Sequence, residues 1–210
     1  MSFGLTHAIA RGAQSLGVPV SPQAVDTLSD LVALTLRHNR RVNLIGRCTT
    51  EQAVDRHVHD ALALLRVLDR PIVTERAQRW LDIGAGGGFP GLVLAAARPS
   101  LAVTLVEPIT KKAALVAHAA ATLGLTNATI ETTRVEDLAP PAPGTAALSR
   151  ATFPPAEWLA RGRRLVGPGS AVLVLMGGEA DPEVLHAAAI VDRVTLPLSG
   201  ARRTNALVLT

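Results

Sequence analysis

Residues 1 to about 70 show a helical pattern of apolar positions. Two groups of apolar residues recur at spacings of three and four, which places each group on one face of a helix. The second group ends just before Pro71, a residue type that stops helices. The groups are Leu28, Leu31, Val32, Leu34 and Leu36, and then Val54, Val58, Ala61, Leu62, Leu64, Leu65 and Leu68. The pattern predicts two or three packed helices.

The pattern changes at Trp80, where short apolar runs begin to alternate with Ala-rich helical stretches. The runs typical of strands cover residues 80–84, 101–107, 128–133, 145–149, 171–176 and 206–210. The helical stretches cover residues 90–97, 109–123, 154–165 and 181–189, with Gly124 as a stop signal for the second. This alternation predicts an α/β fold with a mostly parallel sheet.

Composition limits the class of protein. The chain has 210 residues, 48% hydrophobic and 18% charged, which fits one domain with a helical extension and excludes global disorder. No apolar run is long enough to span a bilayer and no secretion signal opens the chain, so we expect a cytoplasmic protein with no membrane partner. Cys48 is the only cysteine, which excludes an internal disulfide, and we expect it to be a partly buried apolar residue. Because the histidines are scattered, we expect no metal site.

Positive charge gathers near the N-terminus. The net charge is +4, and residues 1–79 carry ten Arg against seven Asp and Glu. The excess is densest at Arg37, Arg40, Arg41 and Arg47, where several guanidinium groups can share a helix face and the loop after it. Phosphate backbones would be natural partners for them, although a solvated helix face explains the charge equally well. With no Tyr and three Phe, base-stacking platforms are not expected.

The strongest chemical signal is the segment DIGAGGGFPG at residues 82–91, which follows a predicted strand and precedes a predicted helix. Gly84 and Gly86 permit a tight turn and a close approach of the backbone to a ligand, and Pro90 suits a first helical turn. A dinucleotide fingerprint would place a third glycine at position 89, where this chain has Phe89. The motif therefore disfavours NAD.

A carboxylate follows at a matching offset. Glu107 ends the second predicted strand 23 residues after Gly84, close to the offset at which an acid binds ribose hydroxyls in nucleotide-binding folds. With a third loop at Val135 and Glu136, residues 80–210 resemble a class I S-adenosylmethionine methyltransferase, a Rossmann-like fold with a mostly parallel seven-stranded sheet. The resemblance implies that Val135 and Glu136 contact adenine, although Glu136 could equally lie in a solvated loop.

A closer resemblance includes the N-terminal half. The segments HNRRVNLIG at 38–46, RHVHDAL at 56–62, LDIGAGGGFPGLVLA at 81–95 and SRA at 149–151 resemble the small-subunit ribosomal RNA guanine-N7 methyltransferase family, also known as glucose-inhibited division protein B. The resemblance implies a helical region at 1–72 docked on a methyltransferase core at 73–210. It also implies methylation of a 16S ribosomal RNA guanine, in naked RNA or in the small-subunit particle. We expect the protein to be a monomer.

The same resemblance assigns roles residue by residue. The expected cofactor-binding residues are Asp82, Gly84, Ala85, Gly86, Gly88, Phe89, Glu107, Val135, Glu136 and Arg150. The expected catalytic residues are Arg150 near the methyl acceptor and Asn43, His57 and Asp60, which brace its pocket. A structural alternative stays open for these last three, since Asp60 could simply orient His57 and fix a helix against the sheet. Lys111 and Lys112 match basic residues of the family or begin a solvated helix.

The expected chemistry needs no general base, because guanine N7 keeps a lone pair at neutral pH. Arg150 would be a positioning group bonded to guanine O6 or to a phosphate. Some positions depart from the family pattern: Met176 stands where a lysine is usual, and Ile45 and Ala61 replace threonine and serine. The alternatives left open are a methyltransferase for another RNA or a small molecule, a catalytically silent cofactor- or RNA-binding module and, last, a nicotinamide oxidoreductase.

Overall fold

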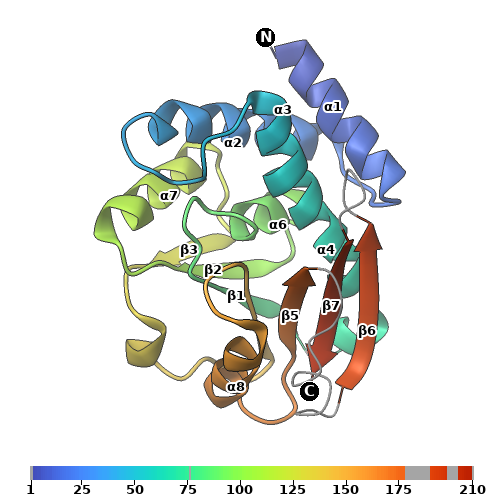
Figure 1. The fold of residues 1–210 in the computed structure, drawn as a ribbon, viewed down its shortest axis with the longest axis vertical. Helices are drawn as coiled ribbons and strands as arrows, with labels where there is room; N and C mark the ends of the chain where they lie inside the picture. Colours follow the sequence, from blue (N-terminus) through green and yellow to red (C-terminus); the bar gives the residue numbers. More distant parts are fainter. Residues whose placement is uncertain (1, 76, 178–189, 198–202, 210) are drawn as a thin grey trace.

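A seven-stranded sheet forms the centre of the computed structural model, which describes residues 2–75, 77–177, 190–197 and 203–209 (Figure 1). The strand order is β3-β2-β1-β4-β5-β7-β6. The first five strands are parallel, whereas β7 is antiparallel to both neighbours. The strands are β1 Arg79–Ile83, β2 Ala102–Val106, β3 Ala128–Glu131, β4 Thr145–Ser149, β5 Val172–Gly177, β6 Ile190–Pro197 and β7 Arg203–Leu209.

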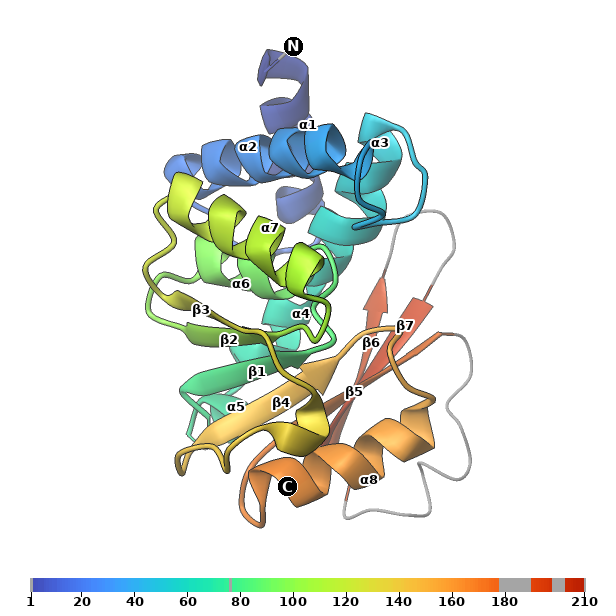
Figure 2. The same ribbon diagram turned by 90° about the vertical axis from the view of Figure 1, so that its left-hand side faces the viewer.

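Helices cover both faces of the sheet (Figure 2). On one face lie α4 Asp60–Leu68, α6 Gly91–Ala97 and α7 Thr110–Thr122, and α1 Ser2–Ser15 and α2 Pro22–Asn39 form an outer layer over them. On the other face lies α8 Pro155–Val166. The short elements are α3 Thr50–Ala53, η1 Val54–His59, α5 Pro71–Thr74 and η2 Val135–Asp137. None of the described helices combines the length and the apolar character that a membrane crossing needs.

The N-terminal helices share one hydrophobic core with the sheet. A single cluster of buried side chains joins Leu28 of α2 and Leu62 of α4 to Leu92 of α6 and Leu105 of β2. A second cluster fills the opposite face, where Trp158 of α8 packs on the sheet and its Nε1 donates to Leu173 O at 2.9 Å. The predicted helical extension is therefore packed on the sheet, and the boundary expected at residue 72 stays a prediction.

Most predicted elements are found near their expected positions. The six predicted strands and three of the four predicted helices agree with the structure to within a few residues. The helix expected at 181–189 lies outside the described residues. The apolar pattern did not predict β6, because Asp192 and Arg193 interrupt its apolar run. Charged residues are common in strands at a sheet edge, where β6 lies, since they discourage pairing with another chain.

One helix contains an irregular turn. From Thr50 to Leu68 the chain is helical throughout, but Val54–His59 is a π-helix between the α-helical segments α3 and α4. A π-helical turn widens the helix by one residue and is found most often at functional sites. This turn contains His57, one of the predicted catalytic residues.

The strand order reverses between β1 and β4. From β1 the chain continues outward to β2 and β3, and then returns to β4 on the other side of β1. Ligands of such sheets bind outside the carboxyl ends of the strands at this switch point. The loops that follow β1, β2 and β4 therefore define the place where a site is expected.

Candidate functional site

The glycine loop after β1 depends on its glycines. Gly84, Gly86 and Gly88 have φ values of 75°, 57° and 88°, in the left-handed region that side chains disfavour. Space is also short, because a Cβ on Gly84 would lie 2.3 Å from Thr152 Oγ1 and one on Gly88 would lie 2.7 Å from Leu92 Cδ1. A Cβ on Gly86 would meet nothing closer than 3.8 Å. The loop is thus packed from below but open at Gly86, where a ligand can approach.

Asp82 anchors this loop from inside the protein. Its side chain is buried at the end of β1, and Oδ2 accepts a hydrogen bond from Gly91 N at 2.8 Å. Burial raises the pKa of Asp82 to about 6, although the Gly91 hydrogen bond and the charge of Arg150 oppose the rise. Asp82, predicted to line the cofactor, therefore supports the loop from behind through the first residue of α6.

Glu107 connects the loop after β2 to the glycine loop. Its side chain is buried, with Oε2 accepting from Gly86 N at 2.9 Å and Oε1 accepting from Ile109 N at 2.9 Å. Each carboxylate oxygen has a second lone pair, so these bonds fix the carboxylate and leave it able to accept hydroxyl hydrogens. Ile109, beside it, is 51% exposed, an apolar surface that sequence analysis did not single out.

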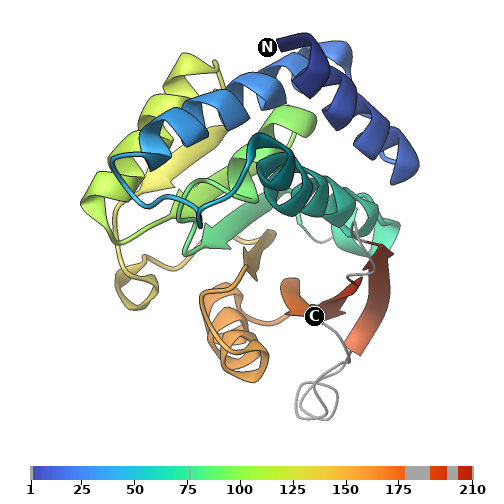
Figure 3. The ribbon, with the colours of Figure 1, turned by 45° about the horizontal axis from the view of Figure 1, so that its top comes forward.

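The loop between α2 and α3 packs against the glycine loop. Asn39 Oδ1 accepts from Leu44 N at 2.8 Å and from Ile45 N at 3.0 Å, which closes the chain on itself. A Cβ on Gly87 would lie 3.1 Å from Leu44 O, so the two loops touch here (Figure 3). The predicted residue Asn43 is exposed, and the residue that organises this loop is Asn39. Both asparagines lie in the same motif, and sequence pattern alone did not distinguish them.

Arg150, which follows β4, reaches the π-helical turn. Its Nη1 donates to Arg56 O at 2.9 Å, and its Nη2 lies 2.9 Å from His57 Nδ1. A guanidinium has no acceptor, so Nδ1 of His57 must accept and the ring carries its hydrogen on Nε2. The His57 ring also lies against Phe89 of the glycine loop, with centroids 5.1 Å apart. The predicted residues Arg150, His57 and Phe89 therefore form one contiguous group.

Two carboxylates act on the charge of Arg150. Burial lowers the pKa of its guanidinium, and the charges of Asp60 and Asp82 oppose that shift. Asp60, the first residue of α4, is thus close enough to Arg150 for its charge to act on the guanidinium. Ala151, which follows Arg150 in the chain, has a φ of 56°, an uncommon conformation for a residue with a side chain. Such backbone strain is concentrated at functional sites.

The predicted adenine-contacting residues lie on η2. Val135 packs against the core under α8, and Glu136 is exposed and forms an ion pair with Arg161 of α8. The Arg161 guanidinium also lies 4.9 Å from the centre of the Phe153 ring. Both predicted residues line a hollow of about 420 Å³ between η2 and α8. Within the described part of the chain no hydrogen bond or ion pair joins them to Glu107, and their contact with adenine stays a prediction.

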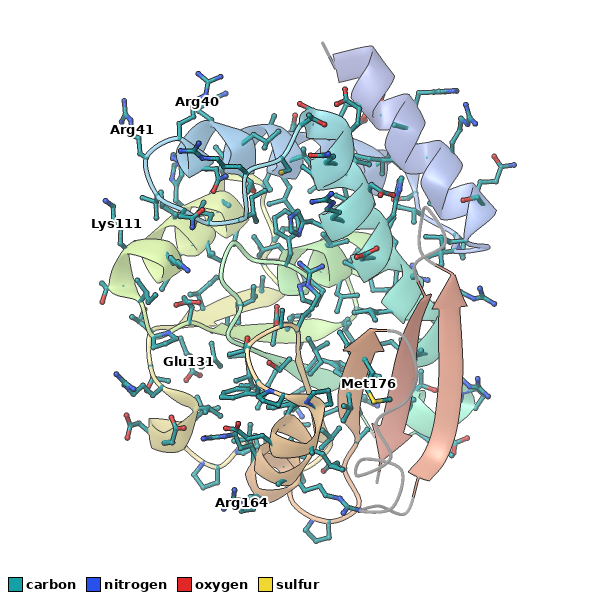
Figure 4. All side chains as sticks on the ribbon, in the orientation of Figure 1. Arg40, Arg41, Lys111, Glu131, Arg164 and Met176 are labelled. Carbon is teal, nitrogen blue, oxygen red and sulfur yellow. The ribbon has the colours of Figure 1, made fainter. Side chains whose placement is uncertain are left out.

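The structure also places three other residues for which the sequence gives an expectation, namely Met176, Cys48 and Lys111. Met176, at the end of β5, is buried with Trp158 and Val174, so its side chain fills the core under α8 (Figure 4). A lysine there would have to bury its charge, and the methionine is therefore a packing residue and not a lost surface contact. Cys48 is partly buried against the core, as predicted. Lys111 is exposed in the first turn of α7.

Comparison with known proteins gives consistent matches. A family model described as "GidB: rRNA small subunit methyltransferase G" matches residues 24–194. The chain is 35% identical to ribosomal RNA small subunit methyltransferase G of Anaeromyxobacter sp. (strain Fw109-5), over 95% of this chain and 94% of that protein. It is 36% identical to the protein of that name in Burkholderia pseudomallei (strain 1106a), over 86% and 78%. A mutant of MtNAS in complex with S-adenosylmethionine has the same fold, with a TM-score of 0.56, 14% identity and 98% and 97% coverage.

Proposed function

Because this chain belongs to the GidB family of rRNA small subunit methyltransferases G, we propose that it transfers the methyl group of S-adenosylmethionine to N7 of a guanine in 16S ribosomal RNA. The observation that carries this proposal is the convergence of the four motif segments at the switch point of the sheet. These segments come from distant parts of the sequence, yet Leu44 of the first packs on Gly87 of the glycine loop. His57 of the second contacts both Phe89 of that loop and Arg150 of the fourth segment.

The cofactor side fits the chemistry of a sulfonium nucleoside. The open backbone at Gly86 admits a ligand, and Glu107 is held in place beside it with lone pairs for ribose hydroxyls. The carboxylate of Glu107, held next to Gly86, favours a cationic cofactor. The exposed face of Ile109 is suited to cover an adenine ring. In this proposal Ala85 and Phe89 complete the wall that the loop presents.

The acceptor side of the site is suited to holding guanine N7 in line with the methyl group of the cofactor. S-adenosylmethionine supplies an electrophilic methyl group, and guanine N7 supplies a lone pair that needs no deprotonation. The protein then has to hold the acceptor in line, and positioning of this kind can contribute about 7 to 11 kcal/mol in well-aligned cases. Arg150 is engaged by the backbone and ring of the π-helical turn. We therefore assign it to positioning His57 and the loop after β4, and not to acid–base chemistry.

The alternative of a divergent substrate loses its main support. It depends on Met176 as a lost basic contact, and the burial of that side chain removes this reason. A ribosomal RNA substrate is consistent with action in the cytoplasm, and we propose that the enzyme acts as a monomer.

Methyl transfer tests the proposed function. The protein is incubated with methyl-labelled S-adenosylmethionine and with small-subunit particles or 16S ribosomal RNA lacking the modification. The RNA is then digested and its nucleosides are identified by mass spectrometry. We expect label in 7-methylguanosine at one position. If S-adenosylmethionine binds but no RNA is labelled, the proposed function is wrong and a silent binding module replaces it.

A further inference from the structure

A hollow of about 580 Å³ lies between the end of α2 and the start of α3, outside the cofactor site. It is lined by Leu36, Asn39, Arg40, Arg47, Cys48, Thr49, Thr50 and Glu51. We propose that this hollow binds a phosphate of the RNA backbone through Arg40 and Arg47. The inference rests on the proposed function, because it identifies how the RNA substrate is held next to the cofactor site.

The two arginines are exposed and available. Among the residues that the structure describes, the guanidinium groups of Arg98 and Arg161 are held by carboxylates, and that of Arg150 is held by the π-helical turn. No interaction of this kind holds the side chains of Arg40 and Arg47 within the described part of the chain. Exposed cations without a carboxylate partner are the usual electrostatic basis of phosphate binding.

Neighbouring cations reinforce this face. Arg40 and Arg41 project outward from the end of α2, and Lys111 of α7 projects outward on the same side of the molecule (Figure 4). Arg37, in the last turn of α2, adds a further positive charge. The positive potential therefore extends along the edge where the loop 40–49 joins α2 to α3, and a nucleic-acid backbone could follow it.

The charge of the lining suits a single phosphodiester. Thr49 Oγ1 accepts from Gln52 N at 3.2 Å, and Gln52 Oε1 accepts from Thr49 N at 3.1 Å, so these amides are already used. Arg40 and Arg47 carry the positive charge on the lining, and their planar guanidinium groups match two phosphate oxygens. Glu51 offsets one of the two positive charges on the lining. The net charge of +1 that remains balances one phosphodiester.

A phosphate in this hollow would be at a fixed place relative to the cofactor loop. Asn39 lines the hollow and also accepts the two hydrogen bonds that press Leu44 and Ile45 against Gly87. The wall of the hollow and the glycine loop are therefore parts of one packed unit. Binding here would orient the RNA as well as retain it, which is what methyl transfer to one chosen guanine requires.

The test compares two pairs of arginines. In the double variant Arg40→Gln and Arg47→Gln, affinity for unmodified 16S ribosomal RNA is measured as a function of salt. Each lost phosphate contact should reduce the slope of log K against log salt by about 0.7 to 0.9, and the affinity at about 0.1 M salt by about five- to eightfold. The matched control, Arg66→Gln with Arg79→Gln, removes two exposed arginines elsewhere and should change neither.

A substitution that removes a negative charge instead of a positive one gives a second test of the proposal. Glu51→Gln removes the negative charge from the hollow and should strengthen RNA binding and steepen the salt dependence. The proposal is overturned if the Arg40 and Arg47 variant keeps the wild-type slope, or if the control pair lowers the slope as much. Calorimetry with S-adenosylmethionine should give wild-type binding in all variants, which confirms folding. If the wild type methylates RNA and only the slopes fail to change, this inference is wrong and the proposed function stands.

Discussion

Asp82 is the residue whose environment departs most clearly from that of an ordinary carboxyl group. It lies at the end of a buried strand, and its one described hydrogen bond comes from Gly91 N. Burial disfavours the charged form, which raises its pKa from 3.8 to about 6. The folded protein therefore binds a proton more tightly than the unfolded chain does between these values. As the pH rises through about 6, Asp82 loses that proton and the protein loses the associated stability.

We predict the consequence for the pH dependence of stability. The unfolding free energy of the wild type should fall relative to that of Asp82→Asn by about 2 kcal/mol between pH of about 4 and about 7, because asparagine keeps an acceptor for Gly91 but does not ionise. Denaturant unfolding at a series of pH values measures the difference. The exposed Asp30→Asn on α2 is the control and should give a profile parallel to the wild type. If the unfolding free energy of Asp82→Asn follows the same pH dependence as that of the wild type, the aspartate does not titrate in this window.

At the scale of elements, the π-helical turn and the loop after β4 depend on each other. The turn presents Arg56 O and His57 Nδ1 side by side, and Arg150 occupies both acceptors. The same contact fixes the His57 ring on Phe89, so it ties the N-terminal helices to the glycine loop. A helical irregularity costs stability unless neighbouring groups satisfy it, and Arg150 provides that compensation here.

This arrangement predicts a specific effect of Arg150→Met. The variant loses the donor to Nδ1, so nitrogen NMR should show His57 changing from the single Nε2–H tautomer to a mixture. Loss of alignment should lower kcat for methyl transfer by about tenfold to a hundredfold, with little change in KM for S-adenosylmethionine. Arg150→Lys keeps the charge but cannot serve both acceptors, and it should restore only part of kcat.

Arg66→Met provides the control for this experiment, because Arg66 is an exposed arginine on α4, the continuation of the same helix. It should leave both the tautomer and kcat unchanged. An Arg150→Met protein with the wild-type tautomer and wild-type kcat would mean that the contact is only structural packing.

At the scale of the whole molecule, the sequence predicts the features that depend on a local pattern of residues. It does not predict those that depend on tertiary packing. The glycine loop, its strand and its helix were predictable because Gly84, Gly86 and Gly88 must adopt left-handed conformations within one short segment. Sequence alone did not predict the burial of Met176, because that burial depends on α8 packing across the sheet. The contact between Arg150 and His57 joins residues 93 apart, and no spacing rule predicts it. The choice between Asn39 and Asn43 likewise depends on how the loop folds back.

The site as a whole is an assembly of loops from three strands and the N-terminal helices around the switch point. The proposed function rests on the claim that a cationic sulfonium nucleoside binds beside Gly86 and Glu107. Titration calorimetry of the wild-type protein with S-adenosylmethionine, S-adenosylhomocysteine and NAD tests that claim most directly. We predict one molecule of S-adenosylmethionine per chain, weaker binding to Glu107→Ala, and no heat with NAD. Binding of NAD in place of S-adenosylmethionine, or equal binding of S-adenosylmethionine to Glu107→Ala, would contradict it.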